Sequence, residues 1–148
     1  MPGKPGTESR STPPGWKVAV GRLTDLCLPS FSQTSGLETA ALSRDPAVEP
    51  CYLADPLAHD RISARQLFGV MDAGKWVLEH AAELAVPVLL MHGSVDRLTS
   101  MAASCEFAVR AGSLCTLKIW DGCYHELHNN LEKDRVLEEV LAMARWTS

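Results

Sequence analysis

The sequence predicts an α/β protein built on a short parallel sheet. Residues 86–91 are six apolar or proline positions without polar alternation, which is typical of a strand buried on both faces of such a sheet. Residues 116–120 form a second apolar segment, and it ends at the turn Asp121-Gly122. A helical pattern separates the two segments. Strand, helix and strand within about thirty residues make a βαβ unit, which crosses over right-handedly.

Composition limits what the chain can be. Its 148 residues suffice for one domain with a sizeable core, and 46% apolar content is ordinary for a globular protein. A net charge of −4 without basic clusters argues against a nucleic-acid partner, which needs a positive surface. The apolar runs are far shorter than the roughly 20 residues that span a bilayer, and no apolar signal follows Met1. We therefore expect a cytoplasmic protein without a transmembrane segment, in contact with membranes only peripherally if at all.

The cysteines predict free thiols. Their number is odd and no C-x-x-C pair occurs, so a disulfide framework is not expected. Cys123, His125 and His128 resemble three metal ligands, but a fourth partner at a useful spacing is missing and the three would crowd one short loop. We therefore predict no metal site and no cofactor. The five cysteines are Cys27, Cys51, Cys105, Cys115 and Cys123.

The N-terminal part predicts a disordered segment followed by helices and loops. Residues 1–15 are rich in Pro, Gly, Ser and Thr, and such a segment buries too little surface to offset the entropy of ordering. An apolar helical face runs over residues 16–28, and residues 30–36 form a polar loop. Between residues 36 and 62, two Asp-Pro pairs break long helices and start short ones, so we expect loops and short helices rather than sheet.

Two longer helices are predicted from their caps and apolar spacing. Ser63 opens a capping box, and the helical pattern that follows reaches about Leu84. Thr99 or Ser100 caps the helix between the two strands, and Gly112 ends it.

The C-terminal residues predict one more helix, which Asn129 or Asn130 caps. The chain thus divides into a disordered segment (residues 1–15), a helical segment (residues 16–84) and a sheet-containing segment (residues 85–148).

An acid and an imidazole follow the two predicted strands. Asp96 lies in the turn after residues 86–91, and His125 lies five residues past Trp120. Ligands bind at the carboxyl edge of parallel sheets, and we expect the two side chains to meet there. A carboxylate that holds one imidazole nitrogen leaves the other as a general base for a hydroxyl nucleophile. The alternative is that Asp96 only closes a turn and His125 caps the last helix, and spacing alone does not decide between the two.

Several segments together resemble the monoacylglycerol lipase and lysophospholipase branch of the α/β-hydrolases, which are serine aminopeptidase S33-like. The resemblance spans roughly residues 16–146 and implies the C-terminal half of that fold. Residues 16–84 would be a helical lid, and residues 85–148 would hold the last two parallel strands with their flanking helices. The matching segments are S-G-L at 35–37, L-S-R-D-P at 42–46, Y-L-A-D-P-L at 52–57, P-V-L-L-M-H-G-S-V-D at 87–96 and G-C-Y-H-E at 122–126.

The resemblance implies roles for the acid and the imidazole. In this family the Asp of the H-G-x-x-D turn is the triad acid, and the His of the G-x-x-H-E loop is the triad base. These positions are Asp96 and His125 here. The family commonly continues H-E-x-x-N-E, and Asn130 replaces the last carboxylate. We expect this replacement to alter a helix cap with little catalytic consequence.

The nucleophile of the family is missing from these 148 residues. No G-x-S-x-G motif occurs, and neither does the upstream His-Gly loop that helps to form the oxyanion hole. Ser94 lies in the Asp96 turn, while Ser104 and Cys105 lie within a predicted helix, so none is on a strand-to-helix elbow. A sheet of about two strands also leaves an open edge. We therefore expect a marginally stable chain that self-associates through this edge.

Three functions remain open from the sequence. The first and favoured one is membership of a serine-hydrolase family that acts on lipid esters such as monoacylglycerols or lysophospholipids, with this chain inactive alone. The second is a non-catalytic binding or interaction protein derived from the hydrolase fold. The third is a truncated product with no independent function. Whether the chain is itself an enzyme is therefore not decided by its sequence.

Overall fold

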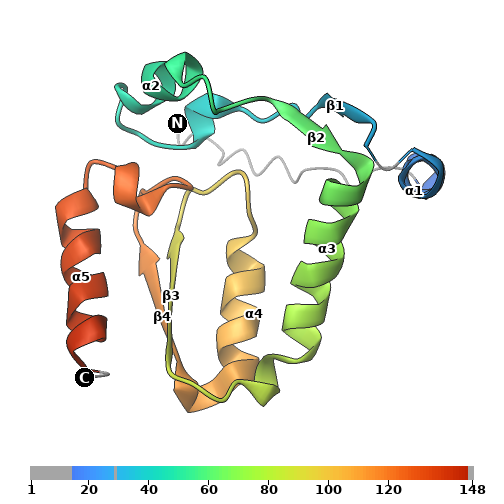
Figure 1. Ribbon diagram of the computed structural model, residues 1–148. Coiled ribbons are helices and arrows are strands. Elements are labelled where there is room, and N and C mark those ends of the chain that lie inside the picture. Colours follow the sequence, from blue (N-terminus) through green and yellow to red (C-terminus); the bar gives the residue numbers. More distant parts are fainter. Residues whose placement is uncertain (1–14, 29, 147–148) are drawn as a thin grey trace, which may run out of the picture.

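The computed structural model describes residues 15–28 and 30–146 (Figure 1). The disorder predicted for residues 1–15 concerns positions outside this range, except for Gly15, which begins a helix. Short 3-10 turns lie at residues 39–41, 81–83, 112–114 and 127–129. The helices are α1 (Gly15–Cys27), α2 (Val48–Ala54), α3 (Ala64–Glu79), α4 (Met101–Ala111) and α5 (Lys133–Trp146), and the strands are β1 (Ser32–Thr34), β2 (Arg61–Ser63), β3 (Val88–Gly93) and β4 (Cys115–Trp120).

The parallel sheet consists of β3 and β4, as predicted. The two strands are in register from Val88 opposite Cys115 to Gly93 opposite Trp120. Helix α4 connects them and packs on both strands and on α3. Figure 1 shows α5 on one side of the strands and α4, followed by α3, on the other. The α/β class and the βαβ unit are therefore confirmed.

A second, antiparallel pair joins β1 to β2, and the sequence did not predict it. Ser32 pairs with Ser63 and Thr34 pairs with Arg61. The prediction of a loop over residues 30–36 is wrong at β1, and the prediction of no sheet between residues 36 and 62 is wrong at β2. Both are short and polar, so they carry no alternating pattern, and a contact between distant residues creates the pairing. The Arg61 guanidinium adds to it by donating to the Ser32 hydroxyl at 3.0 Å.

Helix α1 packs against α3 through charged and aromatic contacts. Arg22 donates two hydrogen bonds to the Asp72 carboxylate, at 2.8 and 2.6 Å, and its guanidinium lies 4.2 Å from the centre of the Phe68 ring. Ser63 accepts a hydrogen bond from the backbone N–H of Gln66 at 3.1 Å, which is the predicted cap of α3. The helix ends at Glu79 and a 3-10 turn follows, so the regular α-helix is shorter than predicted.

The core lies where the end of β4, the loop that follows it and the first turn of α5 meet. Trp120, Cys123, Leu127 and Val136 are buried together, and Met91 packs against them. Many large apolar side chains elsewhere are exposed, including Val70 on α3 and others on α5. Among the described residues, every helix is too short or too polar to cross a bilayer.

Candidate active site

The structure brings Asp96 and His125 together at the carboxyl ends of β3 and β4. The Nδ1 atom of His125 lies 2.9 Å from Oδ2 of Asp96. Asp96 follows β3 by three residues, and His125 follows β4 by five. The two parallel strands thus deliver both side chains to one edge of the sheet, which is where ligand sites form in open α/β sheets.

The end of β3 packs directly against the backbone of the loop that carries His125. A Cβ atom at Gly93 would lie 2.3 Å from the carbonyl oxygen of Cys123 and 2.4 Å from that of Tyr124. Such distances are impossible for a real side chain, so the loop approaches this closely only because position 93 is glycine. The backbone N–H of Val95 also donates to the Cys123 carbonyl at 3.1 Å. The acid turn and the histidine loop therefore form one rigid unit.

Ser94 adds two hydrogen bonds between the same two segments. Its hydroxyl donates to Asp121 at 3.1 Å and accepts from the backbone N–H of Gly122 at 2.8 Å. Gly122 has φ of +70°, a conformation that other residues rarely adopt. The Ser94 hydroxyl is thus occupied in holding the turn, which agrees with its rejection as a nucleophile.

The Asp96 carboxylate is buried and surrounded by donors. Its side chain is 3% exposed. Oδ1 accepts from the backbone N–H groups of Leu98 at 2.7 Å and Thr99 at 3.0 Å, and Oδ2 accepts from the Thr99 hydroxyl at 2.6 Å. Burial raises the pKa of Asp96, but the hydrogen bonds from Thr99, His125 and Leu98 outweigh it and lower the pKa to about 2. The carboxylate is therefore ionised at neutral pH.

His125 is the accessible member of the pair. Its side chain is 36% exposed, in contrast to that of Asp96. Because Nδ1 faces an ionised carboxylate, this nitrogen carries the proton and donates it. The Nε2 lone pair then remains available to accept a proton from a hydroxyl group. A buried acid that orients an accessible imidazole is the arrangement that general-base catalysis needs.

Asn130 is fully buried and bonds to the backbone of the histidine loop. Its Oδ1 accepts from the backbone N–H groups of Arg44 at 3.1 Å and Tyr124 at 3.4 Å, and its Nδ2 donates to the carbonyl of Glu126 at 2.8 Å. The Asn129 side chain donates to the Glu126 carboxylate at 2.7 Å. The prediction that Asn129 or Asn130 caps the last helix is therefore wrong.

Helix α5 begins at Lys133 instead. The predicted cap failed because an asparagine amide can satisfy distant backbone groups as well as local ones. Asn130 stays connected to α5 only through its backbone, since its carbonyl accepts from the N–H of Lys133 at 3.1 Å.

Sequence reasoning also missed the contact between residues 42–45 and the histidine loop. The Ser43 hydroxyl donates to the Asn129 carbonyl at 2.7 Å, and the Arg44 guanidinium pairs with the carboxylate of Glu132. The backbone N–H of Glu126 donates to the carbonyl of Leu42 at 2.8 Å. The sequence signal for this contact was the L-S-R-D-P segment at residues 42–46, which matches the family but was given no structural role.

Cys123 is a buried thiol that bonds to a carboxylate. Its side chain is fully buried, and its Sγ donates to Glu132 at 3.3 Å. Burial, and then the carboxylate of Glu132, raise the pKa of Cys123 to about 11. A thiol with so high a pKa is a poor nucleophile, because the thiolate is the reactive form.

The other rejected nucleophiles are also engaged elsewhere. Ser104 lies within α4, and its hydroxyl is 2.9 Å from Nδ1 of His92 in β3. Cys105 is half-buried in the same helix. In the part of the chain that the structure describes, neither side chain is bonded to His125. The structure thus pairs Asp96 with His125, and within residues 15–28 and 30–146 neither of these rejected side chains bonds to the pair.

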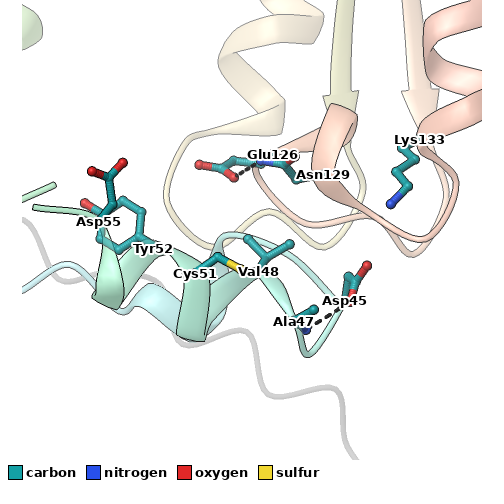
Figure 2. Close-up of a pocket in the computed structure, with 9 residues that line it drawn as sticks. All are labelled: Asp45, Ala47, Val48, Cys51, Tyr52, Asp55, Glu126, Asn129 and Lys133. Atoms are coloured by element: carbon teal, nitrogen blue, oxygen red, sulfur yellow. Dashed lines mark hydrogen bonds between the residues drawn. The ribbon is translucent and has the colours of Figure 1, made fainter. Parts of the chain in front are cut away.

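A cavity of about 400 Å³ opens beside this site but does not include Asp96 or His125. Figure 2 shows it between α2 and the loop that follows His125, with Glu126 and Asn129 on the loop side. Four of its lining residues carry charges, which is unlike a pocket for an acyl chain. Its lining residues are Asp45, Ala47, Val48, Cys51, Tyr52, Asp55, Glu126, Asn129 and Lys133.

Comparisons with known proteins show the family of the chain. Residues 4–132 match the family described as serine aminopeptidase, S33. The chain is 34% identical over 125 residues to a monoacylglycerol lipase of Mycolicibacterium smegmatis, covering 83% of this chain and 44% of that protein. It is 34% identical over 119 residues to human monoglyceride lipase, covering 78% of this chain and 39% of that protein.

A solved structure also matches this chain over part of its own length. The crystal structure of the monoacylglycerol lipase of Paleococcus ferrophilus superposes with a TM-score of 0.84 at 28% identity, covering 91% of this chain and 53% of that one. The chain therefore spans less than half the length of the two lipases matched by sequence, and about half of the solved chain. The architecture is part of an α/β-hydrolase fold, and the chain belongs to the serine aminopeptidase S33 family.

Proposed function

We propose that this chain supplies the acid and the base of a serine esterase that cleaves monoacylglycerols or related lipid esters such as lysophospholipids. The observation that carries the proposal is the 2.9 Å contact between His125 and the buried carboxylate of Asp96 at the ends of adjacent parallel strands. The similarity to proteins named monoacylglycerol and monoglyceride lipases supports the substrate class.

The nucleophile comes from sequence outside these 148 residues. The chain contains no G-x-S-x-G motif, and it covers only 44% and 39% of the two lipases matched by sequence. The open edge of the sheet formed by β3 and β4 gives the missing part a place to add strands. When that part is absent, the same edge favours self-association, which sedimentation over a range of concentrations measures directly.

In the proposed reaction, Nε2 of His125 removes the proton from the serine hydroxyl as the oxygen attacks the ester carbonyl. Asp96 stays ionised and stabilises the imidazolium that forms. The imidazolium then protonates the departing alcohol oxygen, which leaves an acyl-enzyme. Water, deprotonated by the same nitrogen, releases the fatty acid and restores the serine.

A chimera tests this proposal. Residues 30–146 replace the matched segment of the Mycolicibacterium smegmatis lipase, and fatty-acid release from a monoacylglycerol is measured. We expect hydrolysis, and we expect Asp96→Asn and His125→Ala in the chimera to lower kcat by about 10⁴-fold, as loss of a triad member does. The matched control is His128→Ala, which removes an exposed imidazole nearby.

Two outcomes would count against the proposal. One is a chimera that melts cooperatively and yet hydrolyses no ester. The other is labelling of the 148-residue chain alone by a fluorophosphonate, since this probe reacts only with an activated serine. We expect the chain alone to stay unlabelled.

A further inference from the structure

A second histidine lies beside Asp96 and has no role in the proposed reaction. His92, in β3, is 8% exposed. Its Nδ1 lies 2.9 Å from the hydroxyl oxygen of Ser104 in α4, and its Nε2 lies 3.4 Å from Oδ2 of Asp96. This is the same carboxylate oxygen that contacts His125. The ring of His92 thus lies between a hydroxyl and the acid of the candidate site.

The surroundings of His92 decide which of its nitrogens carries the proton. Nε2 is buried and makes no hydrogen bond of regular geometry, although it lies near the Asp96 carboxylate. A lone pair on Nε2 would face a buried negative charge, whereas an N–H group would be attracted to it. The proton therefore belongs on Nε2. Nδ1 is then an acceptor, and the Ser104 hydroxyl donates to it.

We propose that Ser104 and His92 are positioning residues that hold Asp96 in line with His125. The Ser104 O–H donates to Nδ1 of His92, and the protonated Nε2 of His92 lies 3.4 Å from Oδ2 of Asp96, close enough for electrostatic attraction although no hydrogen bond forms. The same oxygen is hydrogen-bonded to His125 and to the Thr99 hydroxyl. Removing His92 takes this attraction from Oδ2, and the contact with His125 weakens.

The chain of hydroxyl, imidazole and carboxylate is not a second catalytic triad. In a serine-hydrolase triad the carboxylate binds Nδ1 and the hydroxyl binds Nε2, whereas around His92 the two nitrogens are exchanged. The backbone N–H of Ser104 donates to the Ser100 carbonyl at 3.2 Å, so this N–H is not free to stabilise an oxyanion at Ser104.

The catalytic consequence of this arrangement rests on the proposed function, but the contacts among Ser104, His92 and Asp96 do not. It can be tested on the 148-residue chain without substrate or nucleophile. Failure of the positioning role would thus leave the esterase proposal intact, and failure of the chimera would leave the positioning role intact.

The first test is the tautomer of His92, read from imidazole ¹⁵N NMR of the chain at neutral pH. We expect His92 to carry its proton on Nε2 alone. Ser104→Ala should weaken this preference, because Nδ1 loses its donor while the Asp96 carboxylate remains, and Ser104→Thr, which keeps a hydroxyl, should restore it. His128, which is exposed, serves as the reference in the same spectrum. A proton on Nδ1 of His92 in the unaltered chain overturns the proposal.

The second test follows the Nδ1 proton of His125, which exchanges slowly with water while it is bonded to Asp96. In His92→Phe we expect this exchange to speed up about fivefold or more, because the buried carboxylate loses one favourable electrostatic contact. His92→Gln keeps an N–H donor at the place of Nε2 and should largely restore the slow exchange. His128→Phe is the matched control. Equal exchange in the unaltered chain and in His92→Phe shows that His92 does not position Asp96.

Discussion

The carbonyl oxygen of Cys123 occupies the space that a side chain at position 93 would need, 2.3 Å from where its Cβ would lie. This contact, rather than any bond between the side chains of the site, sets how closely the acid turn and the histidine loop approach. The catalytic geometry that we propose therefore depends on a residue that has no side chain.

We expect Gly93→Ala to destabilise the chain by about 2 kcal/mol or more, because two carbonyl groups must move to admit the methyl group. The control is Gly74→Ala in α3, where a Cβ would meet nothing within 4 Å. That change should stabilise by about 0.5–1 kcal/mol, since alanine favours the helix. Urea denaturation of both variants measures the difference. A Gly93→Ala chain as stable as the parent would disprove the close approach.

Asp96 makes stability depend on pH in the acid range. Its folded pKa of about 2 lies below the ordinary value of 3.8, so the ionised carboxylate stabilises the fold above about pH 4. This contribution is lost as the pH falls from about 4 to 2 and amounts to about 2 kcal/mol. In Asp96→Asn the pH dependence of the free energy of unfolding should flatten over that range. Urea titrations at several pH values measure it, and parallel curves for the two chains would contradict it.

Asn130 should be more important for stability than its neighbour Asn129. Asn130→Ala leaves partly buried backbone groups of Arg44, Tyr124 and Glu126 without their partner, and we expect a loss of about 2–3 kcal/mol. Asn129→Ala removes one bond to Glu126 and should cost about 1 kcal/mol or less. Thermal denaturation compares the two. Similar losses from both substitutions would show that the Asn130 amide is not the main support of the histidine loop.

The cysteines should differ sharply in reactivity. Cys27 and Cys51 are exposed, whereas Cys123 is buried with a pKa of about 11. We expect iodoacetamide at neutral pH to modify the first two in the folded chain and to modify Cys123 only after denaturation, because the thiolate is the reactive form. Peptide mass spectrometry gives the order. Early modification of Cys123 would mean that the loop opens readily.

The sequence by itself determined the parallel strands, the helix between them and the two residues at their ends. The reason is that these features are local: an unbroken apolar run specifies a strand of a parallel sheet, and a turn right after it specifies where Asp96 emerges. Burial on both faces was not confirmed, because β3 is only half-buried from Val88 to Met91 in this two-stranded sheet. The caps of α3 and α4 at Ser63 and Ser100 are read equally well, because each cap bonds to a residue only three positions away.

Only the tertiary structure decided what supports these residues. The amide of Asn130 bonds to the backbone of Arg44, 86 positions earlier, instead of capping the nearest helix. The strands β1 and β2 pair although neither has a strand pattern, and His92 reaches Asp96 and Ser104 at once. Short polar segments and buried polar side chains have several partners available, and the choice depends on which groups the packed chain brings near and shields from water.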